Sequence, residues 1–330
     1  MLNAAPALFM KSILVLSLLL TLAARAQQPA VLAPDLVAQR LLRAIDARPD
    51  QPYAGTTNPR QMLDLYLPKT RASEKPLPVV VYIHGGAWRG GDRGRVSGNV
   101  LAFPASGEYA AASVGYRLST EAKWPAQIHD CKAAIRWIRG HARELNLDPE
   151  RIGVWGASAG GHLVSLLGTS AGVPELDGAL GGFPSLSTRV TCVVNQCGPS
   201  DLTVPLRPNA PTGRDDEAVT GLLGGSIAKK LADAKAASPL THITADDAPF
   251  FAFHGTNDER VNCEQSVKFD AALKNAGVPS LFVPITGSGH GIPFGWELRE
   301  RVTRFLARHL RGVQAEISTD PIAASAPSAK

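Results

Sequence analysis

The chain has few cysteines, and no two of them have C-x-x-C spacing. Its 330 residues include four, Cys131, Cys192, Cys197 and Cys263, without any C-x-x-C pair. This pattern supports neither a zinc site nor a redox motif, and we expect no metal and no cofactor. Four cysteines allow three complete pairings, and the sequence leaves disulfides and free thiols equally open.

A strong charge of one sign and a membrane-length hydrophobic run are also lacking. The formal net charge is +5, and the first 26 residues contribute Lys11 and Arg25 but no acid, so without them the charge is +3. This small excess gives no case for nucleic acid or a charged membrane surface as a partner. The apolar run at residues 12–24 is too short to span a bilayer comfortably.

Residues 1–26 have the parts of a secretory signal peptide. Lys11 precedes the apolar run, and Ala24-Arg25-Ala26 supplies small residues at a cleavage site. The alternative, a buried N-terminal helix, is less well supported because nothing polar interrupts one face of the run. We therefore expect a secreted or periplasmic protein without a membrane span after signal removal. The sequence does not fix its oligomeric state.

The order of the expected elements predicts one α/β domain over residues 27–313. Apolar runs predict strands at residues 62–67, 79–83, 110–116, 152–155, 190–194, 249–253 and 280–285. Helical patterns occur at residues 36–46 (with Asp35 as cap), 125–146, 163–167, 261–276 and 298–310. Continuous rather than alternating apolarity is typical of strands buried on both faces, so we expect a mostly parallel sheet with helices on both sides.

Two stretches fall outside this alternation. Residues 200–247 contain Pro205, Pro208 and Pro211 and a charged patch, and we interpret them as an irregular excursion, or cap, over one rim of the sheet. Residues 314–330 are rich in Ala, Ser and Pro, and we expect them to be a disordered tail.

A G-x-S-x-G motif lies between a predicted strand and a predicted helix. Gly156 and Gly160 flank Ser158, and a serine on so tight a turn presents its hydroxyl outward. An ordinary glycine-rich turn would have the same five residues. The wider context decides between the two interpretations.

A serine nucleophile needs a base, and histidine is the usual one. Of the eight histidines, His290 alone sits in a Gly-rich loop after the last strand, whereas His84 and His254 end strands and are expected to bond loop backbone. Asp258, after the strand at 249–253, is the preferred acid over Asp201, which we interpret as a turn or cap residue. The order serine, aspartate, histidine is the one used by α/β-hydrolases.

The loop after the first buried strand has the features of an oxyanion site. Gly85 and Gly86 let backbone N–H groups face a ligand, and the N–H of Ala159 follows the serine directly. Trp88 is expected to line the entrance or the acyl side, with a plain packing role equally open.

These motifs together resemble the α/β-hydrolase superfamily, and within it secreted bacterial esterases of the hormone-sensitive-lipase and feruloyl or acetyl-xylan esterase-like group. The resemblance covers residues 53–312 and rests on segments 84–88, 124–127, 148–152, 156–161, 254–258 and 289–291. It implies catalysis by Ser158, His290 and Asp258 through an acyl-enzyme, without cofactor. Ala87 departs from the third glycine common in such esterases, which narrows the space beside the acyl group.

The resemblance implies a serine carboxylesterase acting on short-chain or aromatic acyl esters, with acetyl or feruloyl groups of plant polysaccharide as candidate substrates. A serine peptidase of the prolyl-oligopeptidase kind on the same fold is the alternative, although no propeller-type repeat is present. A binding protein that has lost activity is a third hypothesis, and the intact Ser158, Asp258 and His290 argue against it.

Overall fold

A computed structural model describes Met1, residues 36–207 and residues 216–324 of the chain. The predicted signal peptide beyond Met1, the predicted cap Asp35, and residues 208–215 and 325–330 lie outside the described residues.

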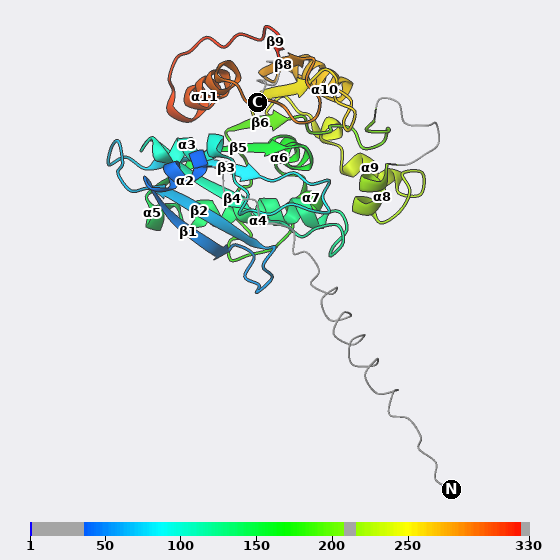
Figure 1. Cartoon of the computed structure of the whole chain (residues 1–330), viewed down its shortest axis with the longest axis horizontal. Helices are drawn as coiled ribbons and strands as arrows, with labels where there is room; N and C mark the ends of the chain where they lie inside the picture. The colour runs from blue at the N-terminus through cyan, green and yellow to red at the C-terminus, as the bar shows by residue number, and fades with distance from the viewer. Residues whose placement is uncertain (2–35, 208–215, 325–330) are drawn as a thin grey trace. The chain divides into compact units, whose positions relative to one another are not determined.

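A nine-stranded sheet organises the described residues (Figure 1), with the strand order β1-β2-β4-β3-β5-β6-β7-β8-β9. The strands are β1 (Ile45–Pro52), β2 (Met62–Pro68), β3 (Leu77–Ile83), β4 (Ala110–Val114), β5 (Leu147–Ala157), β6 (Cys192–Gln196), β7 (Phe250–Gly255), β8 (Ser280–Thr286) and β9 (Ile322–Ala323). β2 is antiparallel to β1 and β4, and all other neighbours are parallel. The predicted mostly parallel sheet is confirmed.

Helices cover both faces of this sheet. They are α2 (Leu36–Leu42), α3 (Gly98–Ala105), α4 (Ala126–Gly140), α5 (Ala142–Leu145), α6 (Ala159–Thr169), α7 (Pro174–Asp177), α8 (Glu217–Leu223), α9 (Leu231–Ala236), α10 (Glu264–Asn275) and α11 (Trp296–Arg311). In β3, Val79 and Val81 belong to the hydrophobic core that contains α4, α6 and α10, and Val80 belongs to the core that contains α3 and α11. Because successive side chains of a strand point to opposite faces, both faces need apolar residues, which explains the continuous runs.

The structure corrects two predicted helices. The helix expected to reach residue 46 ends at Leu42, and the chain then forms the edge strand β1, whose mostly exposed sequence IDARPDQP has no strand-like alternation. The helix predicted over 125–146 ends at Gly140, and His141 separates α4 from the short α5 because its backbone leaves the helical conformation.

The predicted disordered tail is also corrected over its described part. Residues 314–324 follow the surface of the domain, and β9 adds to the exposed edge of β8 with Ile285 opposite Ile322. The nearly buried Arg301 of α11 donates hydrogen bonds to the carbonyl oxygens of Ser318 and Asp320. Backbone pairing, a carbonyl-binding arginine and the packing of Ile317, Ile322 and Ala324 against the core that contains α11 hold the segment in place.

The predicted excursion over residues 200–247 contains two helices in its described part. α8 and α9 lie together beside the sheet in Figure 1, and the short 3-10 helix η1 (Pro239–His242) packs against α6. The predicted cap at this rim is therefore partly helical.

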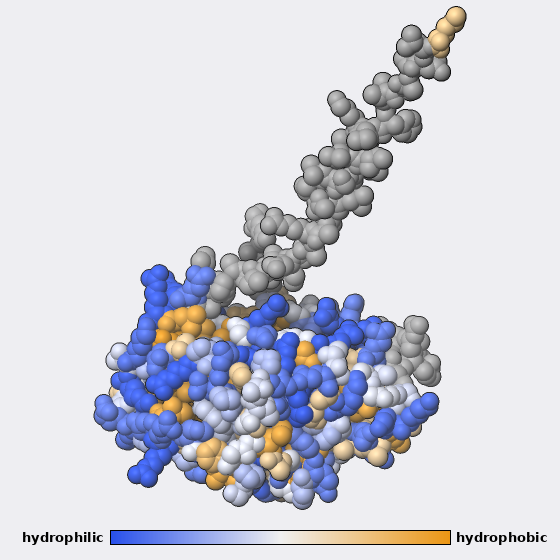
Figure 2. Space-filling model, turned by 90° about the horizontal axis from the view of Figure 1, so that it is seen from below, coloured by the Kyte–Doolittle hydropathy of each residue, from blue (hydrophilic) through white to orange (hydrophobic). Residues whose placement is uncertain are grey.

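The exposed surface is mixed in character. Among the described residues of the domain, the large apolar side chains that are exposed are those of Val204, Leu231, Val267, Trp296 and Val313. Figure 2 shows one face on which hydrophilic and hydrophobic residues alternate in small areas. No helix among the described residues is long and apolar enough to cross a membrane. All four cysteines are free thiols.

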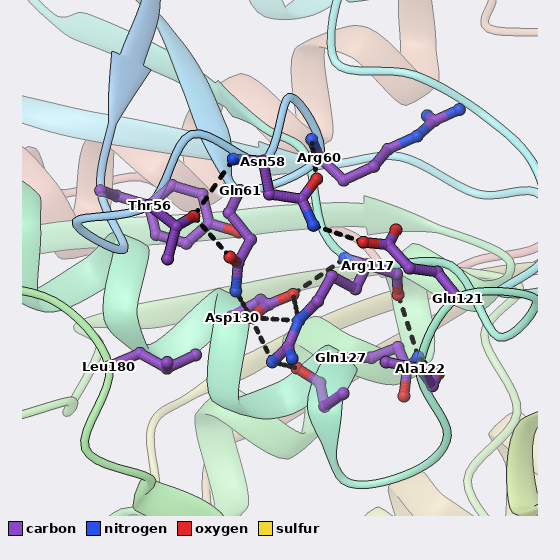
Figure 3. A network of polar contacts seen from close by, with 12 residues as sticks. Thr56, Asn58, Arg60, Gln61, Arg117, Glu121, Ala122, Gln127, Asp130 and Leu180 are labelled. Carbon is purple, nitrogen blue, oxygen red and sulfur yellow. Dashed lines mark hydrogen bonds and ion pairs between the residues drawn. The ribbon is translucent and has the colours of Figure 1, made fainter.

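A buried carboxylate joins α4 to the loops at the end of β4 (Figure 3). Asp130 is fully buried and accepts hydrogen bonds from the Arg117 guanidinium (2.8 Å to Nη2), the Arg117 backbone N–H (2.8 Å) and Gln61 Nε2 (2.8 Å). Gln127, also on α4, donates to the carbonyl oxygens of Arg117 and Ala122. These contacts fix the loop at residues 117–122 against α4.

Replacing Asp130 by alanine is expected to lower the free energy of unfolding by about 3–5 kcal/mol, because it leaves the buried end of the Arg117 guanidinium unpaired. Asp46→Ala is the matched control, since its ion pair with Arg48 is largely exposed, and a change below about 1 kcal/mol is expected there. Urea unfolding measures both. Equal losses for the two variants would contradict the assigned role of Asp130.

Candidate active site

Ser158 occupies a strained turn between β5 and α6. Its φ is 55° and its ψ is −119°, a conformation that a residue with a side chain rarely adopts. The Ser158 N–H donates to the carbonyl oxygen of Gln196 over 2.8 Å, which ties the turn to the end of β6. The hydroxyl is consequently displayed beyond the carboxyl end of the sheet, as the motif predicted.

Three glycines make the turn possible through close backbone approach. A Cβ on Gly156 would collide with the carbonyl of Gly160, and a Cβ on Gly160 would collide with the carbonyl oxygen of Ile83. A Cβ on Gly85 would meet the Ala157 carbonyl oxygen at 2.7 Å. The loop after β3, the end of β5 and the start of α6 therefore touch through bare backbone.

His290 and Asp258 lie in line with the Ser158 hydroxyl. His290 Nε2 is 2.9 Å from Ser158 Oγ, and its Nδ1 is 2.7 Å from Asp258 Oδ2. A carboxylate can only accept, so Nδ1 carries the proton and Nε2 is free to accept the hydroxyl hydrogen. The structure brings the three predicted residues together from the loops after β5, β7 and β8.

Asp258 is buried yet well supplied with donors. Its Oδ1 accepts the backbone N–H groups of Arg260 (2.8 Å) and Val261 (3.0 Å). Burial acts to raise the pKa of Asp258, but hydrogen bonds from His254, His290 and these two N–H groups outweigh it and hold the pKa well below its usual range. The carboxylate is therefore ionised at neutral pH and can orient His290.

His254 is a further partner of Asp258 that the sequence did not reveal. Its Nε2 lies 2.9 Å from the Val261 carbonyl oxygen and 3.1 Å from Asp258 Oδ2, and its Nδ1 lies 2.7 Å from Ser266 Oγ. Both neighbours of Nε2 are acceptors, so that nitrogen is the donor. The predicted bond to loop backbone is confirmed, and the contact with Asp258 adds to it. The only available signal was the four-residue spacing from the acid.

The loop after β3 presents backbone donors beside the serine. Among the described residues, the N–H groups of Gly86 and Ala87 have no protein acceptor, and Ala159, as the first residue of α6, has no acceptor within its helix. Gly86, Ala87 and Ala159 line the same hollow as Ser158. Gly85, also predicted as a donor, does not line the hollow, but its N–H likewise has no protein acceptor among the described residues.

Trp88 combines the two roles left open by the sequence. It lines the hollow but is only 2% exposed, and its indole N–H donates to His162 Nδ1 over 3.1 Å. His162 is itself fully buried.

The other candidate acid, Asp201, is a turn residue, as predicted. Its Oδ1 accepts the Thr203 N–H at 2.8 Å and the Thr203 hydroxyl at 2.6 Å. Asp201 contacts no histidine among the described residues, so Asp258 is the acid that orients His290.

A hollow of about 680 Å³ opens over Ser158 and His290. Its lining includes the apolar Trp88, Pro199, Leu206, Ala218 and Val261 and the charged Arg89, Arg207, Asp216, Glu217 and Arg260. α8 thus contributes to the rim, which places the predicted cap region next to the site. The size and mixed character of the hollow suit a small organic ligand with polar substituents.

Cys197, Asp258 and His290 offer possible metal-ligand atoms within 4.8 Å of one another. Both oxygens of Asp258 already accept hydrogen bonds, and burial raises the pKa of the Cys197 thiol to about 12. A metal ion would have to displace these donors and deprotonate the thiol, so the donor set does not suit one.

Comparisons with known proteins point to esterases. The profile of the BD-FAE family matches residues 63–273. Esterase LipQ of Mycobacterium tuberculosis is 29% identical over 80% of this chain and 62% of its own length, and Esterase LipC of the same organism is 31% identical over 71% and 57%. The chain thus spans about three fifths of the length of these relatives.

Solved structures give the same result for the fold. A truncated carbohydrate esterase from gut microbiota aligns with a TM-score of 0.74 at 30% identity, covering 81% of this chain and 96% of that one. A butyrate-bound esterase 2 of Thermogutta terrifontis aligns with a TM-score of 0.65 at 27% identity, covering 81% and 95%. The predicted α/β-hydrolase fold is confirmed.

Gly160→Ala is expected to lower the free energy of unfolding by about 1–3 kcal/mol, because its Cβ would overlap the Ile83 carbonyl oxygen. It is also expected to slow labelling of Ser158 by a fluorophosphonate. Gly182→Ala is the control, since open space surrounds that position and its φ is not positive, and a change within about 1 kcal/mol is expected. Unfolding and labelling at the wild-type level in Gly160→Ala would refute the tight-turn argument.

Proposed function

This chain belongs to the BD-FAE family of α/β-hydrolases, and from that membership we propose that it is a serine carboxylesterase. The observation that carries the proposal is the continuous line from Ser158 Oγ to His290 (2.9 Å) and on to Asp258 (2.7 Å). Hydrogen bonds at these lengths join a nucleophile, a base and an orienting acid.

In the proposed reaction, His290 Nε2 takes the proton of Ser158 as Oγ attacks the ester carbonyl carbon. The carbonyl oxygen of the ester becomes an oxyanion that the N–H groups of Gly86, Ala87 and Ala159 stabilise. His290 then gives its proton to the alkoxy oxygen, the alcohol leaves, and an acyl-enzyme on Ser158 remains. Water attacks the acyl carbonyl carbon as His290 Nε2 takes its proton, and His290 passes that proton to Ser158 Oγ as the carboxylic acid leaves. Asp258 stays ionised and holds His290 in the required tautomer.

The proposed substrates are short-chain or aromatic acyl esters, in particular acetyl or feruloyl groups on plant polysaccharide. The hollow of about 680 Å³ has apolar walls for an acyl group and a charged rim suited to hydroxyl-rich alcohols. Similar solved structures support this choice, one being described as a carbohydrate esterase and another as a bifunctional GH43-CE of Bacteroides eggerthii. Residues 1–26 support the further proposal of a secreted or periplasmic location.

Ser158→Ala is expected to lower kcat for p-nitrophenyl acetate by at least about 10⁴-fold, because no other group replaces the nucleophile. The exposed Ser185→Ala is the control and is expected to keep wild-type turnover. Equal rates in wild type and Ser158→Ala would reject the mechanism. Turnover of aminoacyl-naphthylamides in preference to aryl esters would favour a serine peptidase instead.

The substrate proposal is tested with acetyl, butyryl and feruloyl esters, each presented on a simple alcohol and on a xylo-oligosaccharide. We expect kcat/KM for the acetylated or feruloylated oligosaccharide to exceed that for the same acyl group on the simple alcohol by at least about tenfold, or 1.4 kcal/mol. A preference for butyryl esters of simple alcohols would contradict a carbohydrate substrate but would still agree with the proposed esterase activity.

A further inference from the structure

The loop after β3 contains two consecutive non-glycine residues in the left-handed conformation. Ala87 has a φ of 54° and Trp88 a φ of 56°, directly after Gly86 with a φ of 123°. Residues with a side chain hold this conformation only where the surrounding structure over-determines it, and such sites cluster where function needs a fixed geometry.

Trp88 joins this loop to two neighbouring segments of the chain. Its carbonyl oxygen accepts the Ser119 N–H over 2.7 Å, and its buried indole N–H donates to His162 Nδ1 over 3.1 Å. The two rings also meet edge to face, with centroids 5.1 Å apart and an interplanar angle of 85°. Backbone and side chain of one residue are thus held from two directions.

The hydrogen bonds of His162 define its tautomer. Nε2 lies 2.6 Å from the Ala237 carbonyl oxygen, which can only accept, so Nε2 carries the proton. An indole N–H can only donate, so Nδ1 must be the unprotonated nitrogen. Burial lowers the pKa of His162 to about 4, against the opposing effect of the Ala237 bond, and the ring is therefore neutral at ordinary pH.

His162 is joined to the serine through the backbone. It lies in the first turn of α6, and its N–H donates to the Ser158 carbonyl oxygen over 3.0 Å. Ser119, the partner of the Trp88 carbonyl, belongs to the loop that Arg117 and Asp130 hold against α4 (Figure 3). Trp88 and His162 therefore connect the loop that presents the Gly86 and Ala87 N–H groups to the backbone of Ser158.

We propose that Trp88 and His162 are positioning residues for the oxyanion site, with the indole–imidazole hydrogen bond setting where the N–H groups of Gly86 and Ala87 point. The inference rests on the proposed esterase function. Donors aimed at the oxyanion act in the transition state and hardly at all on the bound ester. Loss of the hydrogen bond should therefore lower kcat and leave KM nearly unchanged.

Trp88→Phe removes the indole N–H and keeps an aromatic ring. We expect a fall in kcat of about 10- to 100-fold, somewhat below the loss of an oxyanion donor itself, and a KM within about twofold of the wild-type value. Affinity for a boronic acid, which forms a tetrahedral adduct with the serine, should fall by the same factor as kcat. Trp155→Phe is the matched control, because the buried Trp155 indole N–H has no acceptor among the described residues, and its kcat should stay within about twofold.

His162 provides the second, independent pair of variants. His162→Leu leaves the Trp88 N–H without an acceptor and should reproduce the loss in kcat. His162→Asn places an amide oxygen close to the position of Nδ1 and should recover most of it, a rescue that a merely structural role would not produce. Thermal unfolding of each variant identifies those that fold, and if Trp88→Phe does not fold, the comparison of Asn with Leu at position 162 decides.

The outcomes separate this inference from the proposed function. A wild-type protein that neither turns over esters nor reacts with a fluorophosphonate overturns the proposed function. An active wild type with a Trp88→Phe kcat within twofold, with a loss confined to KM, or with Asn and Leu equivalent at position 162, overturns the positioning role alone.

Discussion

The turn at Ser158 is the constraint on which the rest of the site depends. Bare backbone at Gly85 and Gly160 lets the loop after β3 touch the turn, so the nucleophile and the N–H donors share one small space. The positive φ of Ser158 opposes this arrangement, and the hydrogen bond from its N–H to Gln196 helps to hold it. The strained turn and the close packing thus place the Ser158 hydroxyl beside the N–H groups that would stabilise the oxyanion.

The charge of Asp258 is set by two opposing effects, burial and hydrogen bonding. Removal from water disfavours the charge, whereas two backbone N–H groups and two imidazoles favour it more strongly. Oδ1 is satisfied by the backbone of its own loop, and Oδ2 is shared by His254 and His290. Hydrogen bonds to the Val261 carbonyl and Ser266 fix His254. It therefore stabilises the Asp258 carboxylate and takes no part in the proton transfers proposed for His290.

The sequence predicted the parts of the molecule whose signals are local. Central strands such as β3 are buried on both faces and show as apolar runs, and Ser158, Asp258 and His290 follow such strands directly. The edge strand β1 was missed because its residues are mostly exposed, and β9 because it is only two residues long. The contact between Trp88 and His162 could not be predicted, because the two residues are 74 positions apart and no local sequence pattern indicates that they pair.

The structure also supplies a physical criterion for the choice among the histidines. A ring nitrogen bonded to a backbone carbonyl must carry the proton, because the carbonyl can only accept, and such a ring is fixed in one tautomer. Bonds of this kind hold His84, His129, His141, His162, His242 and His254. His290 is likewise fixed in one tautomer, by Asp258, but its unprotonated Nε2 faces the Ser158 hydroxyl and the ring borders the hollow. It can therefore take a proton at Nε2 while its Nδ1–H stays on Asp258, which is what a general base for Ser158 requires.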